Sequence, residues 1–184
     1  MADASLATPA QVLDFWFGAG PKKWFSKDDA FDAEIRERFL PTYEAAAAGR
    51  LSDWEATPDD ALALLILLDQ FPRNMFRGSP RTFAADPLAL AVAKRAVAQH
   101  FDRQLDLPKR NFFYLPFEHS EDLVDQEHCV QLTRRNSDAE GVKWAELHAD
   151  IIRRFGRFPH RNAVLGRAST PEEQAFLHGG GFAG

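Results

Sequence analysis

The stretch ALALLILL, residues 61–68, is the longest apolar run in the chain and decides the fold class. Its eight residues are far fewer than the roughly 20 that a membrane span needs. Pro58 and the acids Asp59 and Asp60 stand before the run, as is typical of the first turn of a helix, and the apolar positions continue to Phe71. The sequence therefore predicts a buried core helix here.

The same pattern, a proline followed by apolar residues at helical spacing, recurs along the chain. Phe31, Ile35 and Phe39 repeat at steps of four, the spacing of one helix face, and no stretch shows a convincing strand alternation. We therefore predict an all-α fold of about eight helices joined by short links. The prolines that stand just ahead of helix-like apolar patterns are Pro9, Pro58, Pro87, Pro108 and Pro171.

Length and composition indicate one helical domain over residues 1–184, since 184 residues with 45% hydrophobic side chains suffice for a sizeable core. Residues 1–8 and the glycine-rich tail 179–184 are expected to be mobile. The net charge of −5 disfavours general adhesion to nucleic acid or to an anionic membrane. Cys129 is the only cysteine, and MADASLATP does not read as a secretory signal, so we expect a cytoplasmic protein.

Two tracts of opposite charge are the strongest functional signal. Residues 151–171 contain five arginines with no lysine and no acid, and residues 111–133 contain five acids with no lysine or arginine. The bland interpretation is that the tracts neutralise one another across a helix contact. In that case Ser120 would cap a helix, and a face carrying Glu118, Asp122 and Asp125 would need partners.

The functional interpretation is that the tracts line a pocket. Arg157 and Arg161 would hold an anionic group, while His119, His148 or His160 would exchange protons. His148 shares a helical stripe with apolar residues, which favours a buried, hydrogen-bonded role for it.

Metal and cofactor chemistry finds no template in the sequence. Asp125 and His128 form one acid-x-x-His step, but a carboxylate-bridged di-metal bundle needs two Glu-x-x-His steps. No Gly-x-Ser-x-Gly, Walker loop or Gly-x-Gly-x-x-Gly appears, and a single cysteine excludes a thiolate zinc cluster. We therefore predict no cofactor and no metal.

One internal echo links two parts of the chain. Phe71-Pro72-Arg73-Asn74 resembles Phe158-Pro159-His160-Arg161-Asn162, and in both tracts a glycine follows the asparagine by four residues. The tracts could be equivalent corners of two helical halves, or two unrelated helix ends of similar composition.

Five longer tracts together resemble a known family. They are VLDFWFG (12–18), LLDQFPRNMFRG (67–78), FAADPLALAVAKRA (83–96), FFYLPFEHSEDLVDQE (112–127) and RRFGRFPHRNAVLGR (153–167). Across about residues 10 to 178 the sequence resembles the bacterial family catalogued as domain of unknown function 924. The resemblance implies antiparallel helix pairs in a fold similar to tetratricopeptide repeats, whose concave faces hold peptides. It implies no activity, and no 34-residue consensus repeat is visible in the sequence.

The leading hypothesis is a cytosolic protein that binds a small anionic molecule or a peptide terminus in a polar cleft. One alternative is a small-molecule hydrolase or lyase with His119 or His160 as base and Asp122 orienting it. Another is a scaffold for helical partners, which would show a large exposed apolar patch. The oligomeric state is left open. The residues expected to line the cleft are Asp69, Gln70, Arg73, Glu118, His119, Asp122, Asp125, Arg157, His160 and Arg161.

Overall fold

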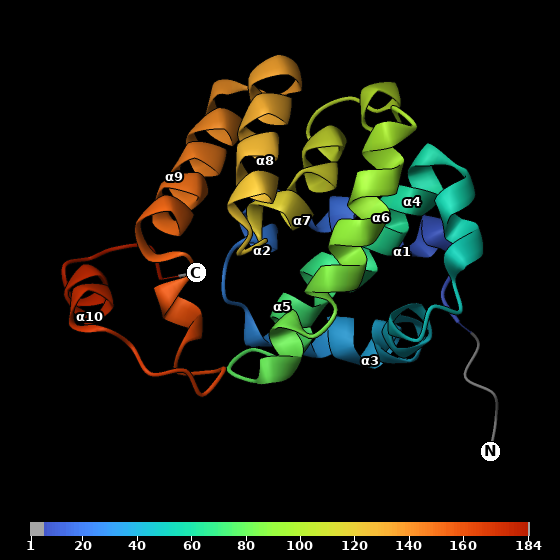
Figure 1. The fold of residues 1–184 in the computed structure, drawn as a ribbon. Coiled ribbons are helices and arrows are strands. Elements are labelled where there is room, and N and C mark those ends of the chain that lie inside the picture. The colour runs from blue at the N-terminus through green and yellow to red at the C-terminus, as the bar shows by residue number, and fades with distance from the viewer. Residues whose placement is uncertain (1–5, 184) are drawn as a thin grey trace.

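In the computed structural model, which describes residues 6–183, the chain is helical and no strand occurs within that range. The all-α prediction is confirmed (Figure 1). The α-helices are α1 (Pro9–Ala19), α2 (Pro21–Trp24), α3 (Asp29–Ala47), α4 (Pro58–Leu65), α5 (Phe71–Met75), α6 (Asp86–Ala98), α7 (Leu115–Glu118), α8 (Leu123–Asn136), α9 (Ala139–Phe155) and α10 (Pro171–His178). Short 3-10 turns are η1 (Ser52–Ala56), η3 (Pro80–Phe83), η4 (Asp102–Gln104), η5 (Lys109–Phe113) and η6 (Pro159–Arg161), and η2 (Ile66–Gln70) is a π-helical turn.

The apolar run forms the centre of the fold, as predicted. Thr57 caps α4 by accepting a hydrogen bond from the Asp60 amide at 3.2 Å, and every residue from 61 to 72 is buried. The run continues through the π-helical turn η2 into α5 without a break in the helical path. Such turns occur often at functional sites, and this one carries Asp69 and Gln70 into the interior.

Aromatic side chains from α1 and α3 cover this central helix. The ring of Phe71 lies 4.8 Å from Phe39 and 5.8 Å from Trp16, centroid to centroid. Phe15 stacks on Phe31 at 5.3 Å. Because α1 packs on α4, and α3 packs on α5, helices distant in the chain meet around one core. The likeness to tetratricopeptide repeats stays a prediction.

The C-terminal part of the chain extends to one side of this body (Figure 1). Helices α8 and α9 pack together as neighbours, and α9 is capped by Gly156, whose left-handed φ of 68° makes the turn. Residues 156–183, here called the C-terminal arm, then fold back beside α9. A second small apolar cluster holds the arm in place through Ile151, Ile152 and Phe158, with Phe155, Phe176 and Phe182 packed around them.

The start of α8 differs from the sequence interpretation. Asp122, not Ser120, is the N-cap, and its side chain accepts from the Val124 amide at 2.8 Å. Glu118 is the last residue of the separate helix α7, because the residues between α7 and α8 are not helical. Glu118, Asp122 and Asp125 therefore do not form one helix face.

Residues close to both edges of the described range make contacts. The Ala7 amide donates to Thr42 Oγ1 at 2.8 Å, and the Gly181 amide donates to the Phe176 carbonyl at 2.9 Å. Residues 1–5 and 184, part of the segments expected to be mobile, lie outside the described residues. Across residues 6–183, none of the helices is both long and apolar enough to traverse a lipid bilayer.

Two phenylalanines test the assignment of the core. Phe71→Ala should lower the free energy of unfolding by about 3–5 kcal/mol, because Phe71 is fully buried at the centre of the aromatic cluster. Phe25→Ala, at a side chain that is 71% exposed, should change it by no more than about 0.5 kcal/mol. Urea denaturation of both variants measures the difference, and equal losses would contradict this core.

Candidate functional site

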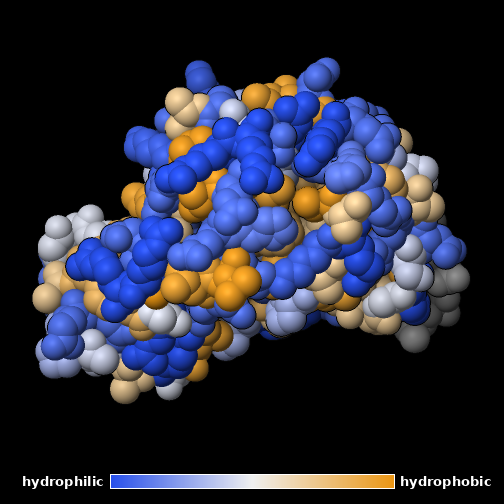
Figure 2. Space-filling model, turned by 45° about the horizontal axis from the view of Figure 1, so that its top comes forward, coloured by the Kyte–Doolittle hydropathy of each residue, from blue (hydrophilic) through white to orange (hydrophobic). Residues whose placement is uncertain are grey.

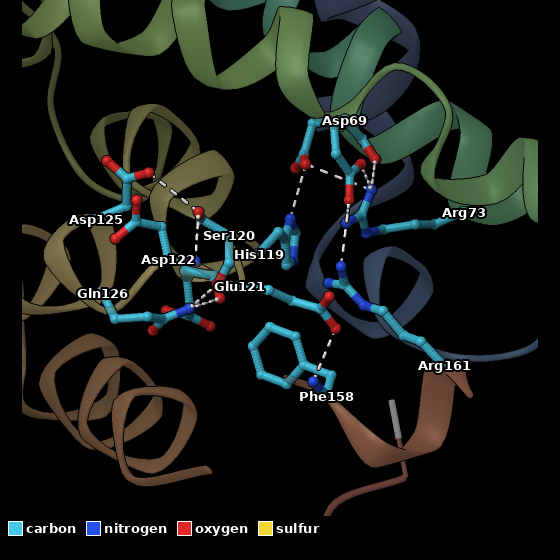
Figure 3. Close-up of polar contacts among 12 residues, drawn as sticks. Asp69, Arg73, His119, Ser120, Glu121, Asp122, Asp125, Gln126, Phe158 and Arg161 are labelled. Atoms are coloured by element: carbon cyan, nitrogen blue, oxygen red, sulfur yellow. Dashed lines mark hydrogen bonds and ion pairs between the residues drawn. The ribbon is translucent and has the colours of Figure 1, made fainter. Parts of the chain in front are cut away.

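A buried carboxylate, Asp69, anchors the candidate site (Figure 3). Its Oδ2 accepts from Gln70 Nε2 at 2.5 Å, and its Oδ1 lies 2.7 Å from Nδ1 of His119. Arg73 Nη1 lies 3.4 Å from the same Oδ1 and donates to the Asp69 backbone carbonyl at 2.6 Å. The side chain of Asp69 is therefore fixed from three directions.

The charge states of this group follow from burial and neighbouring charges. Burial raises the pKa of Asp69, but the charges of Arg73 and His119 and two hydrogen bonds outweigh it and bring the pKa to about 2. Burial and the charge of Arg73 lower the pKa of His119, against the opposing effect of Asp69. At neutral pH, Asp69 is thus ionised and His119 is neutral, so Nδ1 of the ring donates to the carboxylate.

A second carboxylate, Asp86 in the first turn of α6, lies between two arginines. Arg73 donates to both of its oxygens, at 3.0 and 3.1 Å, and Arg161 Nη1 from the C-terminal arm lies 3.6 Å away. Asp86 thereby brings Arg73 of the body and Arg161 of the arm close together, and Figure 3 shows their guanidinium groups near one another.

The guanidinium of Arg161 is held without a full set of hydrogen bonds. Its side chain is 8% exposed, and its Nε is buried with no partner among residues 6–183. The rings of Phe83 and Phe158 lie on it, each with a centroid 4.6 Å from the guanidinium carbon. Burial and the nearby charge of Arg73 lower the pKa of Arg161 to about 10, so it remains positively charged at neutral pH.

Two further histidines and a glutamate complete the surroundings. The buried Nδ1 of His160 has no hydrogen-bond partner within the described part of the chain, and burial with the charge of Arg161 lowers its pKa to about 3. His148 Nδ1 lies 2.8 Å from the Trp144 carbonyl and 3.2 Å from Glu118 Oε1. Burial and the charge of Asp69 raise the pKa of Glu118 to about 8, so this carboxyl is mostly protonated at neutral pH.

Comparison with known proteins agrees with this architecture. The model of a family described as a bacterial protein of unknown function, DUF924, matches residues 12–181. The chain belongs to this family. A solved structure titled as a protein of unknown function, ATU0120 from Agrobacterium tumefaciens, is 45% identical to this chain, with a TM-score of 0.90. The match covers 93% of this chain and 97% of that one, while no curated protein matches.

Most residues that the sequence singled out in this DUF924 chain lie together. The structure brings Asp69, Gln70, Arg73, Glu118, His119, His160 and Arg161 to one place. Sequence reasoning missed Asp86 and Phe83. For His148 it considered proton exchange but favoured the buried, hydrogen-bonded role, and the ring is buried with Nδ1 2.8 Å from the Trp144 carbonyl. Asp86 follows Ala85 in the first turn of α6, where an acid is typical of an ordinary helix start.

Three of the expected cleft residues lie elsewhere. Asp122 is exposed as the cap of α8, so it does not orient His119, whose carboxylate partner is Asp69. Asp125 binds Lys94 Nζ at 2.5 Å and accepts from Ser120. Arg157 donates to both carboxylate oxygens of Glu173 at 2.6 and 2.8 Å, which ties α10 to the turn after α9.

The two charged tracts neutralise one another only in part. Arg167 donates to both oxygens of Glu121, at 2.7 and 3.0 Å, and Arg153 lies 3.8 Å from Glu127. Arg157 and Arg161 instead pair with acids outside the 111–133 tract. As for metals, no group of three or more potential ligands is found among the described residues.

Glu118→Gln tests the protonation of the buried carboxyl. Glutamine keeps an oxygen for His148 and cannot ionise. A carboxyl whose pKa is raised on folding makes the folded state lose stability as the pH rises from the unfolded pKa toward about 8. The variant should therefore be more stable than the natural protein by at least about 1 kcal/mol at pH 8, and by much less at pH 5.

Urea titrations at the two pH values measure this difference. A gain in stability that is equal at pH 5 and pH 8 would show that Glu118 is already ionised in the folded protein.

Proposed function

We propose that this protein binds a small molecule or a peptide end through a carboxylate group, held by Arg161 at the junction of the C-terminal arm and the body. The observation that carries the proposal is the buried guanidinium of Arg161, whose Nε lacks a hydrogen-bond partner among residues 6–183. A buried guanidinium normally has its donors satisfied, because an unpaired buried donor costs roughly 1–3 kcal/mol. Here the Nε has no partner among residues 6–183, and the nearest charged oxygen lies 3.6 Å from Nη1.

The surroundings of Arg161 favour a planar oxyanion. The rings of Phe83 and Phe158 cover the guanidinium, which leaves its edges as the directions of approach. A carboxylate in the plane of a guanidinium accepts two parallel hydrogen bonds, the strongest pairing that arginine makes. Asp86 does not fill this role, because its two oxygens already accept from Arg73.

The neighbouring imidazoles are compatible with an anion. His160 offers a buried ring nitrogen without a partner, and His119 and His160 are neutral at neutral pH. Asp69 and Asp86 balance Arg73 and Arg161 in charge, so a bound anion would add one negative charge to a site that is neutral overall.

The scaffold alternative finds less support. On the face shown in Figure 2, apolar residues form separate groups among hydrophilic ones. The exposed large apolar side chains are scattered along the sequence, from Leu6 and Phe25 to Trp144 and Leu165. A docking surface for a helical partner would be expected to be continuous.

Binding can be measured with simple probes. Acetate, succinate, citrate and a dipeptide with a free C-terminus should raise the thermal unfolding midpoint, and titration calorimetry then gives their dissociation constants. The same dipeptide with an amidated C-terminus tests whether the carboxylate group is required, and the affinities of the free dipeptide and succinate distinguish a peptide end from a free metabolite. Inorganic phosphate tests whether the site prefers a planar anion.

Arg161→Lys keeps the charge but removes the paired donors, so the dissociation constant of the best probe should rise at least tenfold, about 1.4 kcal/mol. Arg157→Lys is the matched control, because Arg157 lies on the same arm and binds Glu173 instead. It should leave the dissociation constant unchanged. If no probe binds, or if both variants bind alike, Arg161 is a structural residue.

A further inference from the structure

We propose that the pair Asp69–His119 is a general base aimed at the carboxylate-bearing molecule, so that the binding site is also the active site of an enzyme. This inference rests on the proposed function, because Arg161 would hold the substrate. The substrate class is a small carboxylate with an acidic O–H or C–H bond near the carboxylate group.

Asp69 fixes the orientation of the His119 imidazole. Its Nδ1 lies 2.7 Å from Asp69 Oδ1, and Asp69 is itself fixed by Gln70 and Arg73. Since an ionised carboxylate accepts the Nδ1 proton, the lone pair of the neutral ring resides on Nε2. A histidine set in this way by a buried carboxylate is the arrangement used for general-base catalysis on several unrelated folds.

Nε2 of His119, the ring nitrogen that does not contact Asp69, is open to a ligand. No hydrogen bond to Nε2 of His119 is found among residues 6–183, and the side chain is 16% exposed. A histidine that served only the core would have both nitrogens satisfied or enclosed by apolar atoms. The second nitrogen of His119 is thus available to a molecule that enters beside it.

Several charged groups act on the ring of His119. The charges of Arg73 on α5 and Asp86 on α6 act on the pKa of His119, and Asp69 on η2 contacts its Nδ1. His119 in turn influences the pKa of His148 and of His160, which places α9 and the arm within electrostatic range. Glu118 and Arg161 stand beside these groups. This environment keeps His119 unprotonated at neutral pH, as a base must be.

The proton transfer itself is simple to balance. The O–H or C–H bond of the substrate breaks, its electron pair stays on the oxygen or carbon, and the proton binds to Nε2 of His119. The imidazolium that forms is stabilised by Asp69, and the negative charge that develops on the substrate lies near Arg73 and Arg161. Asp69 acts through the imidazole and is a positioning residue.

Acylation by diethyl pyrocarbonate tests the base directly, because this reagent attacks unprotonated, accessible imidazole nitrogens. Peptide mapping by mass spectrometry at pH 7 follows each histidine in the intact protein. We expect His119 to react, and its rate to fall at least tenfold when acetate or succinate binds through Arg161. The exposed His178 is the internal reference and should react at the same rate with and without the probe.

Asp69→Asn tests the positioning role. In the natural protein, nitrogen NMR should show Nδ1 of His119 protonated at neutral pH. In the variant, the other tautomer should gain population, and the acylation rate of His119 should fall at least roughly tenfold, since an asparagine does not fix the tautomer. A merely structural role for Asp69 would lower the unfolding midpoint without moving the tautomer.

The outcomes separate this inference from the binding proposal. An unreactive His119, or a reactive one that a bound probe leaves unprotected, overturns the general-base assignment while the carboxylate site stands. Failure of every probe to bind overturns the carboxylate site, and the catalytic inference falls with it. His119→Gln confirms the assignment of the modified peptide.

Discussion

The shared carboxylate of Asp86 is the constraint on which the geometry of the site depends. It accepts two hydrogen bonds from Arg73 in the body and lies 3.6 Å from Arg161 in the C-terminal arm. Without this negative charge, two guanidinium groups would face one another in a partly buried space, where repulsion is poorly screened. Asp86 therefore permits the arm to place a cation beside Asp69 and His119, which belong to the body.

The two echoing tracts turn out to contribute in parallel to this junction. Phe71 and Phe158 are both fully buried, and the arginine of each tract reaches Asp86. The asparagines, Asn74 and Asn162, each donate to a carboxylate, on Asp32 at 2.7 Å and on Glu173 at 3.1 Å. The glycines that follow both have positive φ, 74° at residue 78 and 66° at residue 166. The same residue types thus make the same kinds of contact in both tracts, although one tract is α5 and the other is centred on η6.

The helices could be predicted from the sequence, but only part of the site could, for physical reasons. Helix signals are local, so the apolar run at 61–68 and the proline starts were sufficient to predict them. Ion-pair partners are set by tertiary packing. The sequence places Arg157 in a cleft, whereas its Nε and Nη2 donate to Glu173, which also completes the capping box with Thr170. The sequence offers Asp122 as the partner of His119, whereas the structure supplies Asp69 from a turn 50 residues earlier in the chain. No local pattern marks that pairing.

His160 and Arg161 follow the helices of the main core in chain order, and this order has a consequence for biosynthesis. A chain made from its N-terminus can gather its main core, from α1 to α9, before the arm has left the ribosome. The small cluster around Phe158 is too limited to fold by itself, so it must wait for that surface. During translation the protein therefore passes through a stage in which Asp69, Arg73 and His119 are already assembled while the cation of the arm is missing. The residues that complete the site are therefore made after the core that receives them.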